Sequence, residues 1–263
     1  VAGNGNYKTQ NSIINITDGE LISTADYAVY LPQSGTTTIS GGKVYGAAGG
    51  VCIQRGTLNV EGTALITSKG TGSTGNWGDG TGGLDCAAIN VSGAYGIATV
   101  NIKGGTLIAE AKSLITEGTT YTPVINVTGG TFSDPSVLKY MATNATVDIK
   151  LLSNINIAKT ELATGYILNA ANATANLNLN GHDIINSSET ADATPFTQIF
   201  TVQNGTLNIS GNGNVKCDAS ATAKDDGYRM VIEARGHGTV NIHGGSYYNT
   251  QKLNTQIDLI YAR

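Results

Sequence analysis

Three short motifs contain the side chains that could perform acid–base chemistry. Thr17-Asp18, Asp225-Asp226 and Gly236-His237-Gly238 supply carboxylates and one imidazole, groups that can donate and accept protons in a reaction. An inverting carboxylate pair must lie about 6.5–9.5 Å apart across a cleft. Asp226 and His237 are 11 residues apart (237 − 226), less than half of the repeat described below, so we expect them on different faces. The spacing predicts no assembled hydrolytic site, and we assign no catalytic residue.

The remaining charged and metal-binding residue types are also dispersed. The densest charged stretch, residues 224–229, is the only candidate for the acidic cluster with a nearby base that a calcium-dependent lyase needs, but a turn loop with solvated charges accounts for it without further explanation. Gly82-Gly83-Leu84-Asp85 approaches a calcium-binding glycine repeat only once, whereas such sites need tandem copies. His182, His237 and His243 share no metal-ligand spacing. We therefore predict no metal and no cofactor.

Aromatic side chains offer a second kind of chemistry, because rings stack on the apolar faces of sugars. Tyrosine is abundant, with 12 residues against 3 phenylalanines, and several tyrosines lie near predicted turns. The alternative is that these rings cap the edges of a repeat structure. The candidate glycan-contact residues are Trp77, Tyr121, Tyr228, Tyr247 and Tyr248.

The elements that must position these residues are repeats of one pattern, which reads Thr, apolar, Asn, apolar, any residue, Gly and often a second Gly. Apolar and polar residues alternate in each copy, which predicts a strand with one buried face. The glycines that follow predict a sharp corner before the next strand. The clearest copies are residues 56–62, 98–107, 125–132, 205–211 and 238–247.

The spacing of the copies indicates how they meet. Asn101 and Asn126 are 25 residues apart, and Asn208 and Asn241 are 33 apart. Repeats of about 20–50 residues indicate solenoids, propellers or arrays, and propeller blades need about 40 or more. Short apolar runs before many copies predict a further strand in each repeat. The sequence therefore predicts an all-β fold, a parallel β-helix in which each coil buries its apolar edge against its neighbours. The apolar runs are Ala28–Tyr30, Val51–Ile53, Ala88–Val91, Ile199–Val202 and Met230–Ile232.

Two β-helix units are predicted. The first spans residues 1–141, with a Gly-rich insertion at 69–84 and a closing turn at 131–141, where Ser133-Asp134-Pro135 indicates a helix start. The second spans 142–263. Its last run, residues 258–263, matches residues 230–235, and no further strand follows. We therefore expect a truncated polypeptide, or a stack that another chain continues.

Two segments resemble known repeats. Gly129-Gly130-Thr131-Phe132-Ser133-Asp134-Pro135-Ser136, closing one unit, and Leu177-Asn178-Leu179-Asn180-Gly181-His182-Asp183-Ile184 resemble the right-handed β-helix repeats of large extracellular proteins of gut bacteria and of phage fibres. The resemblance implies the pectin-lyase-like superfold and a right-handed solenoid of roughly ten coils. Members of that superfold include lyases, hydrolases, tailspikes and adhesins. Its polygalacturonase-like hydrolases combine motifs similar to those above with an Arg-Ile-Lys, which this chain lacks.

Composition restricts the partners. The net charge of −4 and the absence of a Lys/Arg cluster predict no nucleic-acid binding, and no apolar run approaches the ~18 residues of a membrane span. The number of cysteines is odd, and they do not have the spacing of metal ligands; they are Cys52, Cys86 and Cys217. They are expected to be buried thiols, with a Cys52–Cys86 disulfide left open.

The combined expectation is a non-catalytic structural or adhesive segment of an extracellular protein, at a cell surface or on a virion fibre. Its expected partners are cell-surface glycans and further copies of itself, as a trimer, which phage fibres of this kind often form, or an end-to-end stack. The alternative is a polysaccharide lyase or glycoside hydrolase of the same superfold. A third possibility, an ice-binding solenoid, needs an unbroken Thr/Asn face, which Glu61, Lys103 and Asp148 interrupt.

Overall fold

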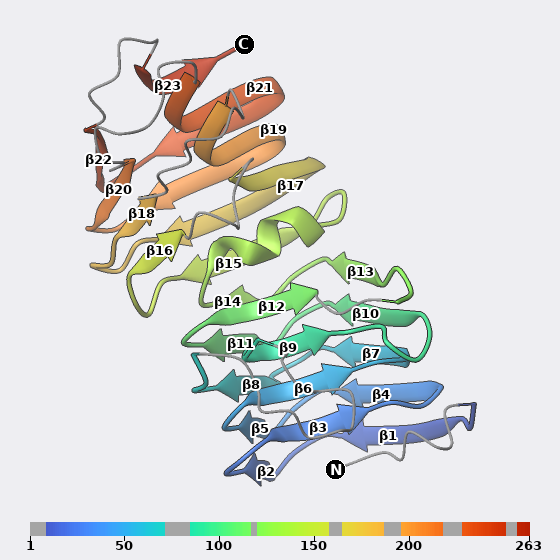
Figure 1. The fold of residues 1–263 in the computed structure, drawn as a ribbon. Helices are drawn as coiled ribbons and strands as arrows, with labels where there is room; N and C mark the ends of the chain where they lie inside the picture. Colours follow the sequence, from blue (N-terminus) through green and yellow to red (C-terminus); the bar gives the residue numbers. More distant parts are fainter. Residues whose placement is uncertain are drawn as a thin grey trace. The chain divides into compact units, whose positions relative to one another are not determined.

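In the part of the chain that the structure describes, the protein is all-β, with strands that pair in parallel and one short 3₁₀ helix (Figure 1). The computed structural model describes residues 9–71, 85–116, 120–157, 165–186, 196–217, 228–250 and 257–263. The chain divides into two compact units, Val1–Tyr140 (unit 1) and Met141–Arg263 (unit 2).

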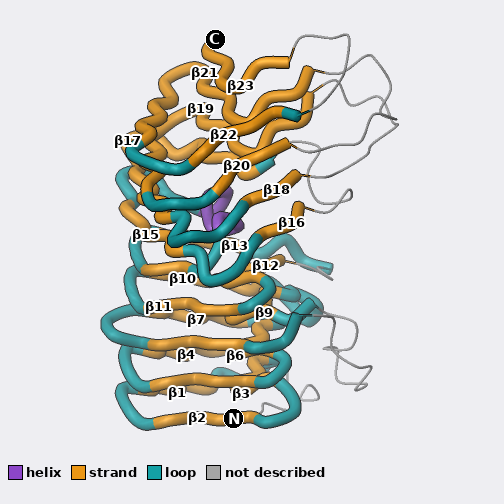
Figure 2. Tube along the Cα trace, turned by 90° about the vertical axis from the view of Figure 1, so that its left-hand side faces the viewer, coloured by secondary structure: helices purple, strands orange, loops and turns teal. Residues whose placement is uncertain are grey.

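Unit 1 contains three parallel sheets, and the chain visits them in a fixed order. Each of the first four repeats contributes one strand to the first, one to the second and one to the third sheet, the fifth contributes only to the first two, and the repeats stack one on another (Figure 2). The first sheet contains β1 (Ser12–Ile16), β4 (Gly35–Ile39), β7 (Gly56–Val60), β10 (Ala98–Ile102) and β13 (Val124–Val127). The second contains β2 (Glu20–Ser23), β5 (Lys43–Gly46), β8 (Leu65–Ser68), β11 (Thr106–Ala109) and β14 (Thr131–Phe132). The third contains β3 (Tyr27–Leu31), β6 (Gly49–Ile53), β9 (Ala87–Val91) and β12 (Lys112–Thr116).

The alternating pattern of the sequence forms the first sheet. In β10, Ala98, Val100 and Ile102 are completely buried, while Thr99 and Asn101 are partly exposed. The predicted apolar runs form the third sheet, where all five residues of each of β3, β6 and β9 are buried. Sheets buried on both faces read as continuous apolar runs rather than as alternation, which explains the two patterns in one repeat.

The corner after the first sheet depends on glycine. The second residue of each Gly-Gly pair has a positive φ, 81° at Gly105 and 84° at Gly245, a conformation that other residues adopt at a cost. The predicted helix start is confirmed, because η2 (Pro135–Tyr140) begins at the proline as a 3₁₀ helix. Asp134 accepts a hydrogen bond from the Ser136 amide (2.8 Å), which caps this helix. Most of the predicted Gly-rich insertion lies outside the described residues.

Unit 2 has two sheets, because three of its strands are long and bent. In β17, β19 and β21, a segment that corresponds to a third-sheet strand of unit 1 runs directly into a segment with the Thr-x-Asn pattern. The strand pairing shifts in register where the two segments join. The long sheet contains β15 (Thr146–Lys150), β17 (Tyr166–Asn178), β19 (Phe196–Ser210), β21 (Tyr228–Ile242) and β23 (Ile257–Ala262). The short sheet contains β16 (Ile155–Ile157), β18 (Ile184–Asn186), β20 (Asn214–Cys217) and β22 (Ser246–Asn249). The predicted match between the last run and residues 230–235 is confirmed, since Met230 pairs with Asp258 and Ala234 with Ala262.

The three cysteines lie in the interior of their units. Cys52 and Cys217 are on strands β6 and β20, and Cys86 directly precedes β9. All three are buried thiols, and the Cys52–Cys86 disulfide that the sequence left open is not formed.

Candidate functional site

A surface hollow lies at one edge of unit 1, where third-sheet strands turn into first-sheet strands. The segments that make this turn are residues 32–34, 54–55, 92–97 and 120–123, and we call them the third-to-first corners. A hollow of about 420 Å³ opens over them, and a neighbouring hollow of about 230 Å³ shares Ser34 and Arg55 with it. We call the two hollows together the corner groove. The larger hollow is lined by Ser34, Arg55, Gly56, Tyr95, Gly96, Ile97 and Tyr121.

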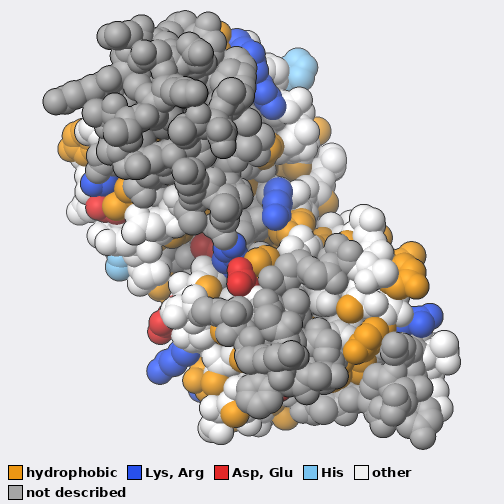
Figure 3. Space-filling view, in the orientation of Figure 1, with side chains coloured by type: hydrophobic (Ala, Val, Ile, Leu, Met, Phe, Trp, Pro, Cys, Tyr) orange, Lys and Arg blue, Asp and Glu red, His pale blue; other side chains and the backbone are white. Residues whose placement is uncertain are grey.

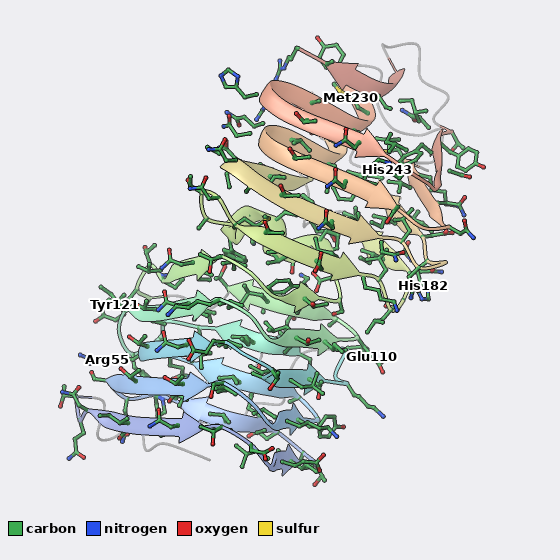
Figure 4. The ribbon with its side chains drawn as sticks, turned by 180° about the vertical axis from the view of Figure 1, so that it is seen from behind. Arg55, Glu110, Tyr121, His182, Met230 and His243 are labelled. Carbon is green, nitrogen blue, oxygen red and sulfur yellow. The ribbon has the colours of Figure 1, made fainter. Side chains whose placement is uncertain are left out.

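Backbone hydrogen bonds between successive corners hold the groove in shape. The Tyr95 amide donates to the Gln54 carbonyl (3.2 Å), and the Tyr121 amide donates to the Gly93 carbonyl (3.2 Å). Arg55 and Tyr121 therefore belong to stacked corners, and Figure 4 shows both on the same edge of unit 1, opposite Glu110.

Arg55 is the basic group of the groove. Its Nη1 donates to the Tyr95 carbonyl oxygen (3.4 Å). Its side chain lies across Gly96, where a Cβ would come within 2.7 Å of Arg55 Cδ and 2.9 Å of Nε. None of the salt bridges among the described residues includes Arg55, and neither hollow is lined by Asp or Glu. A guanidinium without a carboxylate partner is available to an anionic or strongly polar ligand.

The apolar part of the groove is equally exposed. Ile97 has 59% of its surface exposed and Tyr121 has 48% exposed. Burial of either side chain would stabilise the protein, so their exposure is unusual. The groove therefore places an aromatic ring, an aliphatic side chain and a guanidinium beside one another. That combination can cover an apolar ligand face and hydrogen-bond its polar edge.

The structure places only Tyr121 of the five predicted glycan-contact residues in this groove. Trp77 and the side chain of Tyr228 lie outside the described residues. Tyr247 and Tyr248 are successive residues of β22, so their side chains point to opposite faces of the strand and do not form one surface. The sequence prediction missed Arg55, Tyr95 and Ile97, whose only signal was their position in turns between two predicted strands.

Tyr247 has a structural role in unit 2. Its hydroxyl donates to the Gly244 carbonyl oxygen (3.0 Å), so the ring is fixed across the glycine corner. Burial raises the pKa of Tyr247 to about 12 from its ordinary value of 10, because the phenolate is poorly solvated there. The alternative interpretation of the corner aromatics, that they cap repeat edges, therefore fits this residue.

The residues considered for acid–base chemistry form no site among the residues that the structure describes. Asp225 and Asp226 lie outside them, and the Asp18 carboxylate accepts a hydrogen bond from the Gly19 amide (2.7 Å) in a turn of unit 1. His243 and His182 are on different repeats of unit 2 (Figure 4). No group of three His, Cys, Asp or Glu side chains that could hold a metal ion occurs in the described parts of the chain.

One buried carboxylate was not anticipated. Glu233 of β21 is completely buried, and its Oε2 accepts a hydrogen bond from Gln198 Nε2 (3.1 Å). Arg263 Nε lies 2.9 Å from Glu233 Oε1, and Arg235 Nη1 lies 3.7 Å from Oε2. Two guanidinium groups and an amide compensate the buried charge, which indicates an internal ion-pair cluster rather than an open site.

The Thr/Asn face forms a ladder of side-chain hydrogen bonds. Each asparagine amide donates to the oxygen of the equivalent residue one repeat earlier, as Asn101 does to Asn59 (2.9 Å). The asparagines of successive repeats therefore stack, and this stacking stabilises the parallel strands. The further rungs are Asn59–Thr38 (3.4 Å), Asn126–Asn101 (3.0 Å), Asn176–Asp148 (3.0 Å), Asn208–Asn176 (2.8 Å) and Asn241–Asn208 (2.8 Å).

Charged side chains are sparse in the sequence and on the face that Figure 3 shows. Charged residues are 13% of the chain, and those visible in Figure 3 do not gather into a large patch of one sign. No helix in the described ranges is long and apolar enough to cross a membrane.

Fold and groove define the class of the protein as an all-β chain of parallel, stacked repeats with a polar–aromatic groove at a corner. Comparisons with protein-family models, with curated proteins and with solved structures give no match.

Proposed function

We propose that the chain is a right-handed parallel β-helix of roughly ten coils. The support for this proposal is the order of the strands in unit 1, which rotates through three sheets without exception from β1 to β14. In such an arrangement one repeat equals one coil, and each coil buries its apolar edge against the next.

We further propose that this β-helix is a non-catalytic, structural and adhesive segment of an extracellular protein, on a cell surface or a virion fibre, and that it binds glycans. The observation that carries the proposal is the corner groove, where Tyr121 and Ile97 are exposed beside Arg55, a residue with which no carboxylate of the described residues pairs. Sugar rings present apolar faces and polar edges, which match a ring beside hydrogen-bond donors.

The length of the groove suits an oligosaccharide. Its two hollows are lined by residues from Ser12 to Tyr121, which reach from the β1 repeat to the corner before β13. Strands in a sheet are about 4.8 Å apart, so the four intervals from β1 to β13 span about 19 Å. That span exceeds the width of one sugar ring several times.

Binding to a glycan array, followed by titration with the best ligand, tests the proposal. Tyr121→Ala should weaken binding about tenfold or more, because the stacking surface is lost. Tyr248→Ala is the matched control, since both tyrosines have 48% of their surface exposed. An equal loss in both variants, or no glycan binding by the unaltered chain, would overturn the proposal.

Among the described residues, no observation favours the enzyme alternative, because the groove is lined by no carboxylate. Self-association into a trimer or an end-to-end stack belongs to the proposal, and light scattering on the purified chain measures it.

A further inference from the structure

We infer that the corner groove is selective for carboxylate-bearing sugars, with Arg55 binding the carboxylate while the sugar ring lies on Tyr121 and Ile97. This inference rests on the proposed glycan binding and adds the chemical class of the ligand. It does not follow from the aromatic residues, which would serve a neutral glycan equally well.

The donors of Arg55 are largely unused. A guanidinium has five N–H donors in a planar fork, and Arg55 spends one of them, at Nη1, on the Tyr95 carbonyl oxygen. That bond is its only side-chain hydrogen bond to the residues that the structure describes, and no described carboxylate pairs with it. The remaining donors match the two oxygens of a carboxylate, which guanidinium binds through two parallel hydrogen bonds.

The guanidinium is also fixed before any ligand arrives. The Arg55 side chain lies against the bare backbone of Gly96, because even one added carbon there would meet Cγ at 2.9 Å and Cδ at 2.7 Å. The Tyr95 carbonyl oxygen orients the distal end. A side chain that is already ordered loses less conformational entropy on binding, so the groove holds its donor in a defined place rather than on a mobile arm.

The neighbours of Arg55 favour a carboxylated sugar over a small inorganic anion. Ile97 and Tyr121 line the same hollow and are 59% and 48% exposed. A ring with an attached carboxylate covers that apolar surface, whereas free sulfate or phosphate leaves it in water. A sulfated sugar shares the anionic chemistry, and the experiment below separates the two.

The experiment compares three oligosaccharides of equal length by calorimetry, namely a glucuronate-containing chain, its carboxyl-reduced neutral counterpart and a sulfated neutral chain. The unaltered protein should bind the glucuronate chain about 10–100-fold more tightly than the neutral chain, the range expected for a charge-assisted bidentate hydrogen bond. This preference should decrease at high salt.

Three variants assign the preference to Arg55. Arg55→Ala should bind both chains at the neutral affinity, and Arg55→Lys should keep part of the preference, since a single ammonium lacks the fork. Gly96→Ala retains the arginine but displaces it, so it should lower the preference without changing the net charge. Circular dichroism of each variant checks that the fold is intact.

The outcomes separate the inference from the proposed function. Equal affinity of the unaltered protein for the acidic and neutral chains overturns the inference and leaves glycan binding in place. Equal affinity for the sulfated and glucuronate chains overturns the assignment to carboxylate. A preference that survives in Arg55→Ala shows that another residue carries it. Failure to bind any of the three chains overturns the inference, and failure to bind any glycan on the array as well overturns the proposed function.

Discussion

Units 1 and 2 use the same repeat but treat one corner differently. In unit 1 the third-sheet and first-sheet strands are separate, as β6 and β7 are, and the third-to-first corners join them. In unit 2 the equivalent segments merge into the single strands β17, β19 and β21. The groove therefore exists where the strand is interrupted, because only the interrupted corners supply loop residues such as Tyr95, Ile97 and Tyr121.

The continuous strands of unit 2 bend at a local irregularity in strand pairing. The register between β19 and β21 shifts at Val202 and Asn204. Asn204 Nδ2 donates to Asn169 Oδ1 (2.6 Å) beside this shift, so an additional asparagine pair stabilises the bend. A bulge of this kind increases the local twist and turns a strand without ending it. Unit 2 thus turns the corner with a bulge, and unit 1 turns it with a loop.

The largest expected effect tests whether the two units share one kind of core. Leu58 of unit 1 and Leu207 of unit 2 occupy the same position in Gly-Thr-Leu-Asn, and both are completely buried. Leu58→Ala and Leu207→Ala should each lower the free energy of unfolding by about 2–5 kcal/mol, because each leaves a cavity. Urea denaturation measures the loss.

Hydrogen exchange then sharpens the comparison. Each leucine variant should accelerate exchange of the amides in its own unit first, since exchange reports local as well as global opening. Equal acceleration in both units would contradict this and show one cooperative structure. A loss below about 1 kcal/mol in either variant would contradict the assigned burial.

The next largest effect on stability compares the buried ion-pair cluster of unit 2 with an exposed ion pair of unit 1. Glu233→Ala should destabilise unit 2 by about 1–3 kcal/mol, because Gln198 loses its acceptor and the two arginines lose their ion-pair partner. The arginines are partly exposed, so water compensates some of the loss. Glu20→Ala is the control, since the Glu20–Lys43 pair of unit 1 is exposed and should contribute at most about 1 kcal/mol. Equal effects of the two substitutions would contradict the cluster.

The strands of both units were predictable because their cause is local. The alternation of apolar and polar residues predicted the strands of the first sheet, and the glycine pairs predicted the corners, as at Gly105. The order of the repeats also followed, because parallel stacking places equivalent residues in register, as for Asn59 and Asn101.

The merged strands, the groove and the buried carboxylate could not be predicted, because each depends on contacts between repeats. Gln203-Asn204 of unit 2 and Gln54-Arg55 of unit 1 are similar polar dipeptides before Gly-Thr-Leu-Asn, yet one continues a strand and the other turns. A glutamate is ordinarily exposed, and the burial of Glu233 depends on Arg263, which directly follows β23, and on Gln198 of β19.

The asparagine ladder is the feature that the units share, so its loss should cost the same in both. Asn101→Ala and Asn208→Ala each remove one donated and one accepted side-chain hydrogen bond, and each should cost about 1–2 kcal/mol. Asp148→Asn should change stability by no more than about 0.5 kcal/mol, because Asp148 only accepts from Asn176 and an amide oxygen can do the same. Thermal denaturation of the three variants measures this, and a cost confined to one unit would contradict a shared ladder.

The smallest effect contrasts the tyrosines of the two units, since Tyr247 is fixed by the Gly244 carbonyl oxygen whereas Tyr121 lines the groove. Tyr247→Phe should cost about 0.5–1 kcal/mol at neutral pH, because one hydrogen bond is lost. The pKa of Tyr247 is raised to about 12 in the folded protein, against 10 in the unfolded chain. Between these values the native state retains a proton that the unfolded state has lost, so stability contributed by Tyr247 is complete below pH 10 and decreases as the pH rises toward 12. Urea titrations across this window should therefore show a shallower decline of stability in Tyr247→Phe than in the unaltered protein, and parallel declines would contradict the burial of the Tyr247 phenol.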